Sequence, residues 1–172
     1  MLTLTLVRHP PVQASQQCYG RLDLLPTAHD LAQAAQQLHH LHGQTIISSP
    51  AQRCLRLAQH LSPCVTINPL WQELDFGQWE GLAWDDIPRH ALDDWAADIW
   101  HYRVGQTGET AAELLIRVQR AIAQLCEQGH SQATVITHAG VIRMVFAHYG
   151  KIADHDRWTA PIAYATPYTL EC

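Results

Sequence analysis

The sequence has no long apolar segment and few charged residues. Its longest apolar runs, such as 133–136, are far shorter than the roughly 18 residues that a membrane-spanning helix needs. Met1 leads directly into a short alternating segment, so we expect neither a secretory signal nor a membrane anchor. Of the 172 residues, 16% are charged and 47% hydrophobic, and the 9 glycines and 9 prolines are scattered. This composition excludes disordered, collagen-like and low-complexity chains and predicts a soluble globular protein.

Paired cysteine spacings are also missing. The five cysteines are an odd number and lie far apart, at Cys18, Cys54, Cys64, Cys126 and Cys172. They therefore match neither zinc knuckles nor redox motifs, and we expect free thiols in a reducing, cytoplasmic compartment. The net charge of −5 argues against a broad nucleic-acid surface, although a local arginine cluster can still bind a small anion.

Histidine, in contrast, is frequent. Three of the twelve histidines, His39, His40 and His42, crowd one predicted helix end. Their spacing lacks the i, i+4 pattern of a catalytic zinc helix, so we interpret them as surface residues. The sequence predicts no metal site.

The length predicts one domain over residues 1–172, because a typical domain has about 150 residues. Short apolar, β-rich runs predict strands at 2–7, 45–48, 65–67 and 133–137. Capping residues and helical spacing predict helices at 27–43, 49–61, 110–129 and 139–149, the second opening with Ser49 as N-cap and Pro50 in the first turn. This alternation favours a three-layer α/β sandwich, with a mostly parallel sheet covered by helices on both faces.

Two further segments are less regular. The segment 82–102 carries Trp84, Trp95 and Trp100 among acidic residues without one clean period. We expect short helices there that form a lid or side wall, with tryptophans that pack rather than stack on a nucleotide. The segment 158–170 alternates weakly and is a candidate edge strand.

Candidate functional residues follow the predicted strands. His9 comes directly after the first strand and His138 after the fourth. Ligands collect beyond the carboxyl ends of parallel strands, so we expect both histidines at one site. Four motifs surround these positions in order, namely Leu-Val-Arg-His at 6–9, Ser-Ser-Pro-Ala-Gln-Arg at 48–53, Glu-Leu-Asp-Phe-Gly-Gln-Trp-Glu-Gly at 73–81 and Thr-His-Ala-Gly-Val-Ile-Arg at 137–143.

This ordered set resembles the histidine phosphatase superfamily, which has the phosphoglycerate-mutase-like fold, and the resemblance extends from Leu4 to about Val145. The Cys-Tyr-Gly-Arg loop at 18–21 and the Asp-Phe-Gly-x-Trp-Glu-Gly string are further similar to its alpha-ribazole phosphatase branch in cobalamin synthesis. Single motifs of this kind are weak evidence, whereas four of them at the expected strand ends are hard to obtain by chance.

The resemblance implies that His9 is the nucleophile, and that Arg8, Arg53 and His138 hold the phosphoryl group. A neutral imidazole can attack phosphorus without first losing a proton, and fixed cations suit the charge on the three equatorial oxygens. Backbone N–H groups of Ala139 and Gly140 at a helix start are further anion donors. Ser15 occupies the position at which relatives often have a pocket-lining asparagine. No metal or other cofactor is implied.

The resemblance also points to Glu73 as the acid that protonates the leaving group. Asp75 and Glu80 lie in the same segment and stay open as alternatives, although Glu80 also suits a role in tying the loop through backbone N–H groups. We interpret Arg56 and Arg143 as solvated or structural.

The sequence departs from the family pattern after the nucleophile, where Pro10 and Pro11 replace the usual glycine and its acidic or amide neighbour. Proline has no N–H, so we expect a backbone contact to phosphate to be missing, with reduced activity or an altered substrate as the consequence. The Pro-Leu-Thr of relatives reads Leu-Pro-Thr at 25–27.

The chain lacks the additional basic segments of the phosphoglycerate mutases, which favours hydrolysis over phosphoryl transfer back to substrate. We therefore predict a phosphomonoester hydrolase with a small phosphorylated substrate, which family analogy suggests to be alpha-ribazole 5′-phosphate. A phosphohistidine-protein phosphatase and a catalytically weak module that binds phosphorylated ligands are the alternatives. Nucleic-acid and membrane partners are not expected, and the sequence leaves the oligomeric state open.

Overall fold

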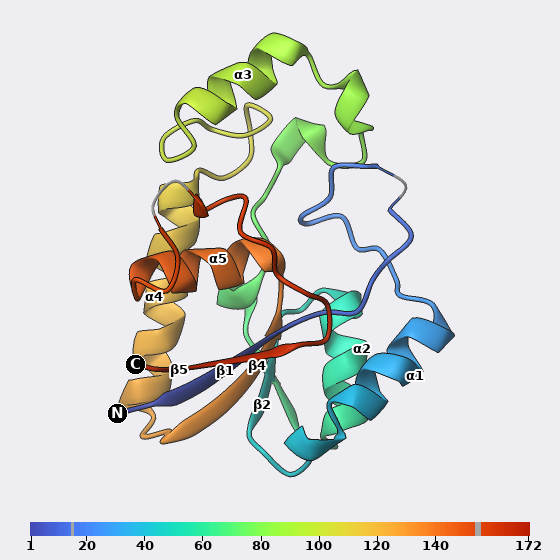
Figure 1. The fold of residues 1–172 in the computed structure, drawn as a ribbon, viewed down its shortest axis with the longest axis vertical. Helices are drawn as coiled ribbons and strands as arrows, with labels where there is room; N and C mark the ends of the chain where they lie inside the picture. The colour runs from blue at the N-terminus through green and yellow to red at the C-terminus, as the bar shows by residue number, and fades with distance from the viewer. Residues whose placement is uncertain (15, 154–155) are drawn as a thin grey trace.

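The computed structural model of the chain describes residues 1–14, 16–153 and 156–172, and its centre is a five-stranded sheet (Figure 1). The strand order is β3-β2-β4-β1-β5. Strands β1 (Thr3–Arg8), β2 (Ile46–Ser48), β3 (Val65–Ile67) and β4 (Gln132–Thr137) are parallel, whereas β5 (Pro167–Glu171) runs antiparallel to β1 at one edge.

Strand β1 shows how the sequence pattern sets the layers. Its side chains alternate between the two faces of the sheet, so Leu4 and Leu6 enter one buried cluster and Val7 enters the other. The intervening Thr5 is only partly covered, and its hydroxyl pairs with that of Thr169 on β5 at 3.0 Å. The leucine–threonine alternation thus marks a strand with one fully covered face.

Helices cover both faces of the sheet. Helices α1 (Ala28–Gln37) and α2 (Gln52–Leu61) pack on the face of Val7, with Ala34 and Leu57 in the shared core. Helices α4 (Ala111–Glu127) and α5 (Ala139–His148) cover the opposite face, with Leu114 and Val141 buried against β1 and β4. The predicted three-layer α/β sandwich with a mostly parallel sheet is confirmed.

Helix boundaries agree with the sequence prediction in part. The capping box of α4 is present, since the Thr110 hydroxyl accepts from the Glu113 N–H and the Glu113 carboxylate accepts from the Thr110 N–H. Helix α1 ends at Gln37 and does not continue to residue 43, because a separate 3-10 turn covers His39–Leu41.

Ser49 as the N-cap of the second helix is wrong. The N-cap of α2 is Ala51, and the first helical N–H, that of Gln52, donates to the Asp23 carboxylate at 2.8 Å. The Ser49 hydroxyl lies 2.8 Å from a ring nitrogen of His138 instead. An aspartate from a distant loop therefore replaces the local cap, which no short-range pattern reveals.

The segment 82–102, which we call the cap, lies apart from the sheet at the top of Figure 1. It contains a 3-10 turn at Trp84–Asp86 and the helix α3 (Arg89–Ala97), as the expected lid or side wall requires. Trp84, Trp95 and Trp100 pack against the large core cluster, which confirms the packing interpretation. The predicted edge strand forms as β5, although it starts later than expected, at Pro167. In the described part of the chain, no helix has the length and apolarity of a membrane span.

Candidate active site

The carboxyl ends of β1, β2 and β4 bring the predicted site residues together. His9 follows β1 and His138 follows β4, and the His9 N–H donates to the Thr137 carbonyl at 3.0 Å. The centroids of the two imidazole rings are consequently 5.3 Å apart. Arg53, in the first turn of α2, is fully buried at the same edge, and its charge acts on the pKa of both histidines.

His9 is held in one tautomer. Its Nδ1 lies 2.7 Å from the Pro10 carbonyl oxygen, which can only accept, so Nδ1 carries the hydrogen and Nε2 the lone pair. Burial, followed by the positive charge of Arg53, holds the pKa of His9 well below its usual value. The imidazole is therefore neutral at pH 7, and its Nε2 can act as a nucleophile. Proline at position 10 keeps the carbonyl that this arrangement needs.

Two guanidinium groups close to His9 are incompletely paired. Arg8 donates to the Ile162 carbonyl at 2.7 Å and lies 3.6 Å from the Tyr164 ring centroid. Arg53 donates to the carbonyls of Gly20 and Leu22, and its ion pair with Asp23 is long, at 4.0 Å. Within the described chain, the buried Nε atoms of both arginines lack a hydrogen-bond acceptor. A buried cation with unused donors favours an anionic ligand, since such groups are costly to bury unpaired.

His138 is fully buried at the start of α5. Its Nε2 lies 2.8 Å from the Ser49 hydroxyl, and the Cys54 sulfur lies within 4 Å of both ring nitrogens, at 3.5 and 3.8 Å. Burial, then the charge of Arg53, lowers the pKa of His138 well below its usual value. It is therefore a neutral hydrogen-bonding group beside His9. Burial likewise raises the pKa of the Cys54 thiol, which stays protonated.

Glu73 belongs to the same site, because it lines one cavity together with His9. Its carboxylate accepts from the N–H groups of Leu74 and Gly140, both at 3.0 Å. The Gly140 N–H, expected to be available for an anion, is therefore taken by Glu73. A Cβ atom at residue 140 would meet this carboxylate, so a larger residue there would displace the Glu73 side chain.

The backbone of Glu73 is fixed by two arginines. Arg21 and Arg117 donate to its carbonyl oxygen at 3.0 and 2.9 Å. Glu109 pairs with Arg117 at 2.6 Å and lies 3.8 Å from Arg21. This Arg-Glu-Arg cluster joins the loop at Arg21 to α4 and fixes the main chain that carries Glu73, so Arg21 of the 18–21 loop is engaged within the protein.

The other two acidic candidates lie in structural contacts. Asp75 accepts from the Gly77 N–H at 2.8 Å. Glu80 accepts from four backbone N–H groups, at Gly20, Arg21, Leu22 and Phe76, between 2.8 and 3.0 Å. The interpretation of Glu80 as a loop tie is confirmed, and of the three carboxylates it is Glu73 that the structure places beside His9.

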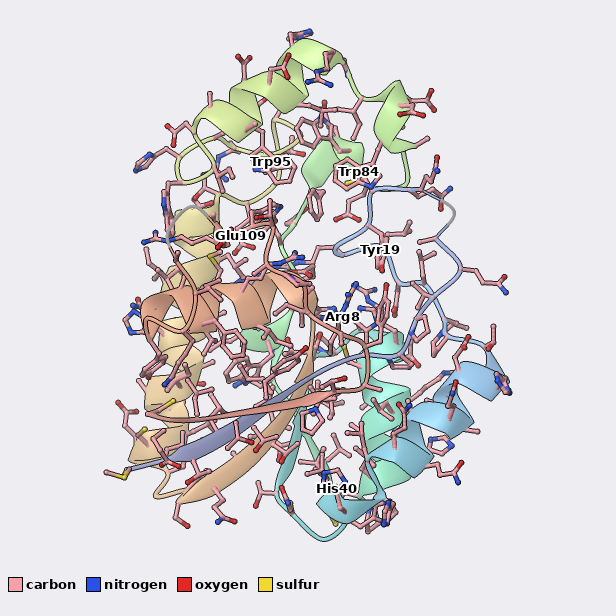
Figure 2. The ribbon with its side chains drawn as sticks, viewed as in Figure 1. Arg8, Tyr19, His40, Trp84, Trp95 and Glu109 are labelled. Carbon is pink, nitrogen blue, oxygen red and sulfur yellow. The ribbon has the colours of Figure 1, made fainter. Side chains whose placement is uncertain are left out.

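A cavity of about 200 Å³ lies in front of His9. Its lining consists of Arg8, His9, Tyr19, Glu73, Phe76, Trp84, Ala139, Gly140, Arg143 and Trp158. Figure 2 shows Arg8 near the centre of the molecule, with Tyr19 above it and Trp84 and Trp95 between α3 and the sheet. Burial, and next the neighbouring Tyr164, raises the pKa of Tyr19 to about 12, so its phenol is protonated.

Sequence reasoning missed several lining residues. Arg143, interpreted as solvated or structural, has a structural bond to the Ala160 carbonyl at 2.8 Å and also lines the cavity. Its position three residues after Gly140 on one helix face was the available signal for the second role. Trp158 gave no signal, because its position depends on the chain path after α5. Ser15 lies outside the described residues. His39, His40 and His42 are remote from this edge, and the described part of the chain contains no cluster of three or more histidine, cysteine or acidic residues fit for a metal ion.

Comparison with known proteins identifies the family. Residues 4–172 match the model of the histidine phosphatase superfamily (branch 1), so the chain belongs to this superfamily. It is a phosphatase, and a metal-independent mechanism fits the family.

Solved structures share the fold across nearly the whole chain. A candidate alpha-ribazole-5′-P phosphatase from Escherichia coli K-12 is 25% identical, with a TM-score of 0.83 over 98% of this chain and 89% of that one. The alpha-ribazole phosphatase from Shigella flexneri is 24% identical, with a TM-score of 0.83 over 98% and 90%. A mycobacterial glucosyl-3-phosphoglycerate phosphatase, in complex with inorganic phosphate, is 22% identical, with a TM-score of 0.81 over 98% and 89%. A search of curated proteins finds no match.

Proposed function

We propose that the protein hydrolyses phosphomonoesters through a phosphohistidine intermediate on His9. The observation that carries this proposal is the locked tautomer of His9, with its Nε2 lone pair available beside the guanidinium groups of Arg8 and Arg53. A tetrahedral dianion in front of His9 would supply the acceptors that the buried Nε atoms of these arginines need.

In the first step, Nε2 of His9 attacks phosphorus and the bond from phosphorus to the ester oxygen breaks. Arg8, Arg53 and neutral His138 stabilise the charge on the three equatorial oxygens. Glu73 gives its proton to the departing oxygen, which leaves as an alcohol. The N–H at Nδ1 remains bonded to the Pro10 carbonyl and supports the positive charge that develops on the ring.

In the second step, water attacks the phosphohistidine and Glu73 takes one of its protons. Inorganic phosphate leaves, and neutral His9 and protonated Glu73 are regenerated. The net reaction of each cycle is therefore ester plus water to alcohol plus phosphate. The N–H of Ala139 at the start of α5 and the Ser15 side chain are further proposed anion contacts. In this proposal, residues 1–172 form one domain that supplies every residue of the scheme.

The proposed substrate is a small phosphorylated molecule, with alpha-ribazole 5′-phosphate as the specific candidate. Support comes from the 18–21 loop and from the alpha-ribazole phosphatases of similar fold. The net charge of −5 speaks against nucleic acid as substrate. All five cysteines are free thiols, which agrees with a cytoplasmic site of action in cobalamin synthesis.

The test is hydrolysis of 4-nitrophenyl phosphate and of alpha-ribazole 5′-phosphate, by the wild type and by His9→Ala, with a chelator present. We expect turnover that persists in chelator and falls by roughly 10⁴-fold or more in His9→Ala. A kcat/KM that favours alpha-ribazole 5′-phosphate would support the specific substrate. Tight binding of phosphate esters by both proteins without turnover would instead favour a binding module.

A further inference from the structure

The guanidinium group of Arg8 has few hydrogen bonds that fix its orientation. It belongs to the residues that would meet the phosphoryl group, which we call the floor, namely Arg8, His9, Arg53, Glu73 and His138. One of its nitrogens donates to the Ile162 carbonyl at 2.7 Å, and no described residue accepts from its buried Nε. A guanidinium group binds a tetrahedral anion through N–H groups that lie in one plane, so the orientation of that plane decides how well it binds.

The ring of Tyr164 lies against this guanidinium group. The guanidinium carbon of Arg8 is 3.6 Å from the Tyr164 ring centroid, well inside the limit of about 6 Å for a cation–π contact. The same ring is 5.8 Å from the imidazole of His9, centroid to centroid. A cation–π contact uses the face of the guanidinium group, whereas its N–H bonds point along the plane. The ring can therefore hold Arg8 without occupying the donors that an anion needs.

Backbone contacts place Tyr164 beside Arg8, although the two residues are distant in the sequence. They form an isolated parallel bridge, and the Ala165 N–H donates to the Arg8 carbonyl at 2.9 Å. The Thr166 hydroxyl donates to the Tyr164 carbonyl at 3.0 Å. Ala165 has a φ of +47°, a conformation that is rare for residues other than glycine and that the surrounding bonds maintain. The position of the Tyr164 ring is thus set by the main chain.

A second tyrosine makes the corresponding contact with Arg53. The Arg53 guanidinium carbon lies 5.2 Å from the ring centroid of Tyr19, which Figure 2 shows above Arg8. The loop that carries Tyr19 is fixed in turn, because the Cys18 N–H donates to the Leu82 carbonyl at 2.8 Å. A hydrogen bond joins the phenols of Tyr19 and Tyr164. The two rings that lie on the arginines therefore support each other.

Neutral rings suit this position better than acidic side chains. A carboxylate beside Arg8 or Arg53 would form an ion pair and compete with the phosphoryl group for the same donors. A phenol ring orients the cation and leaves its charge available. It also keeps water from one face of the guanidinium group, which strengthens the attraction between that group and an anion.

We propose that Tyr164 and Tyr19 are positioning residues, which orient the guanidinium groups of Arg8 and Arg53 for the phosphoryl group. This inference rests on the proposed phosphatase site and extends it by two residues that lie outside the four sequence motifs. Both tyrosines act through the arginines and not on the reacting atoms.

The first test measures the inhibition constant of inorganic phosphate and kcat/KM for 4-nitrophenyl phosphate. Tyr164→Phe keeps the ring face, whereas Tyr164→Leu keeps apolar volume and loses the face. We expect Tyr164→Leu to raise the inhibition constant and lower kcat/KM about tenfold each, and Tyr164→Phe to change both by less than about threefold. Tyr164 is 37% exposed, so its replacement should leave the fold intact. Tyr164→Met is a second variant without a ring, in case the leucine variant does not fold.

The second test observes Arg8 directly by NMR and needs no turnover. A proton above the face of an aromatic ring resonates upfield, and the Nε–H signal of Arg8 can be assigned by its loss in Arg8→Lys. We expect this signal to move downfield in Tyr164→Leu and to stay near its wild-type position in Tyr164→Phe. A role of Tyr164 in stability alone would not distinguish these two variants in this way.

The third test concerns the pair of phenols. Tyr19→Phe and Tyr164→Phe each break the same hydrogen bond, so the double variant should bind phosphate as well as the weaker-binding of the two single variants. Tyr102→Leu is the matched control, because Tyr102 packs against Trp79 in the cap, outside the floor. It should bind phosphate like the wild type.

The inference is overturned if the ring-free variants of Tyr164 bind phosphate like the wild type, or if Tyr102→Leu loses as much affinity as they do. It is also overturned if the Nε–H signal of Arg8 has the same position in Tyr164→Leu and Tyr164→Phe. Failure of the proposed phosphatase function looks different. The effects of Tyr164 on phosphate binding and on the Arg8 signal would then remain, while no ester would be hydrolysed in a way that depends on His9.

Discussion

The floor of the active site and the cap above it are built by opposite means. His9 is 2% exposed, and Arg53 and His138 are fully buried. The backbone beside them continues the sheet, because the N–H groups of His9 and Ser49 donate to carbonyls of β4 at 3.0 Å. Helix α3 of the cap has no buried residue and is joined to the rest of the molecule through aromatic rings such as Trp95.

This difference separates two tasks. Stabilising a transition state requires charges that are fixed before the reaction, and the sheet edge provides such fixation through backbone bonds and burial. Recognising a leaving group requires a shaped surface, which half-exposed rings can provide at lower structural cost. Changes in the floor should therefore reduce turnover of every substrate, and changes in the cap should alter selectivity or local stability.

The largest expected effect is in the floor. Arg53→Lys removes the planar guanidinium group, which binds the carbonyls of Gly20 and Leu22. The unpaired Nε atom is lost with it. We expect kcat/KM to fall about 10²-fold to 10³-fold for all phosphomonoesters. Arg56→Lys is the control, because Arg56 lies one turn away on α2 and is exposed. Equal activity of the two variants would contradict the role of the floor in turnover.

Glu73→Gln should have the next largest effect. The amide can keep one contact to the Leu74 or Gly140 N–H but cannot supply a proton. We expect kcat to fall about 10²-fold for alkyl phosphates and less for 4-nitrophenyl phosphate, whose leaving group needs no protonation. Asp75→Asn, the same chemical change in a contact with Gly77, should spare kcat. A uniform loss across leaving groups would argue against Glu73 as the acid.

Trp95→Ala tests the cap. Trp95 contacts Phe76, Trp79, Trp84 and Trp158, and its truncation should lower the free energy of unfolding by about 2 kcal/mol. Hydrogen exchange should accelerate in α3, while amides of β1 and β4 remain the most protected. Turnover of glycerol 3-phosphate should change by less than about threefold. A loss as large as that of Glu73→Gln would show that cap and floor are not separable.

A pH dependence of stability tests the floor without any substitution in it. Burial, with Arg53 as second cause, lowers the pKa of His9 and of His138 in the folded protein. Below about pH 6.5 the unfolded chain takes up protons at these residues and the folded chain does not. Stability should thus fall as the pH drops from about 6.5 toward the lowered pKa, by up to about 1.4 kcal/mol per pH unit for each histidine. Denaturant unfolding of the wild type and of His138→Gln between pH 5 and 7 measures this loss of stability. Equal slopes of the free energy of unfolding against pH in the two proteins would contradict the prediction.

The sequence predicted the positions of the floor residues because these residues lie at or shortly after the ends of strands. His9 and His138 follow β1 and β4 directly, and the apolar strands and the capping box at Thr110 set the layers. Glu73 was ranked first by family resemblance, and the structure places it at the cavity while Asp75 and Glu80 bind backbone N–H groups. Local sequence patterns were sufficient to place a side chain wherever it lies within or directly after a regular strand or helix.

Contacts between distant segments were not predictable. The Asp23 cap of α2, the Arg21 and Arg117 bonds to Glu73 and the place of Trp158 all depend on how loops cross in space. The loss of a phosphate contact at Pro10 stays a prediction. The contact that the structure shows at this residue uses its carbonyl, which every residue type retains.

The central claim is that His9 carries the phosphoryl group on Nε2. The most direct measurement is to quench wild-type protein in alkali during turnover of 2-phenylethyl phosphate, in which phosphohistidine survives, and to locate the phosphate by peptide mass spectrometry and phosphorus NMR. The account predicts one phosphorylated residue, His9, modified at Nε2, and no label in His9→Ala. Phosphate on another residue, on Nδ1 of His9, or an unlabelled protein under conditions of measured turnover would contradict it.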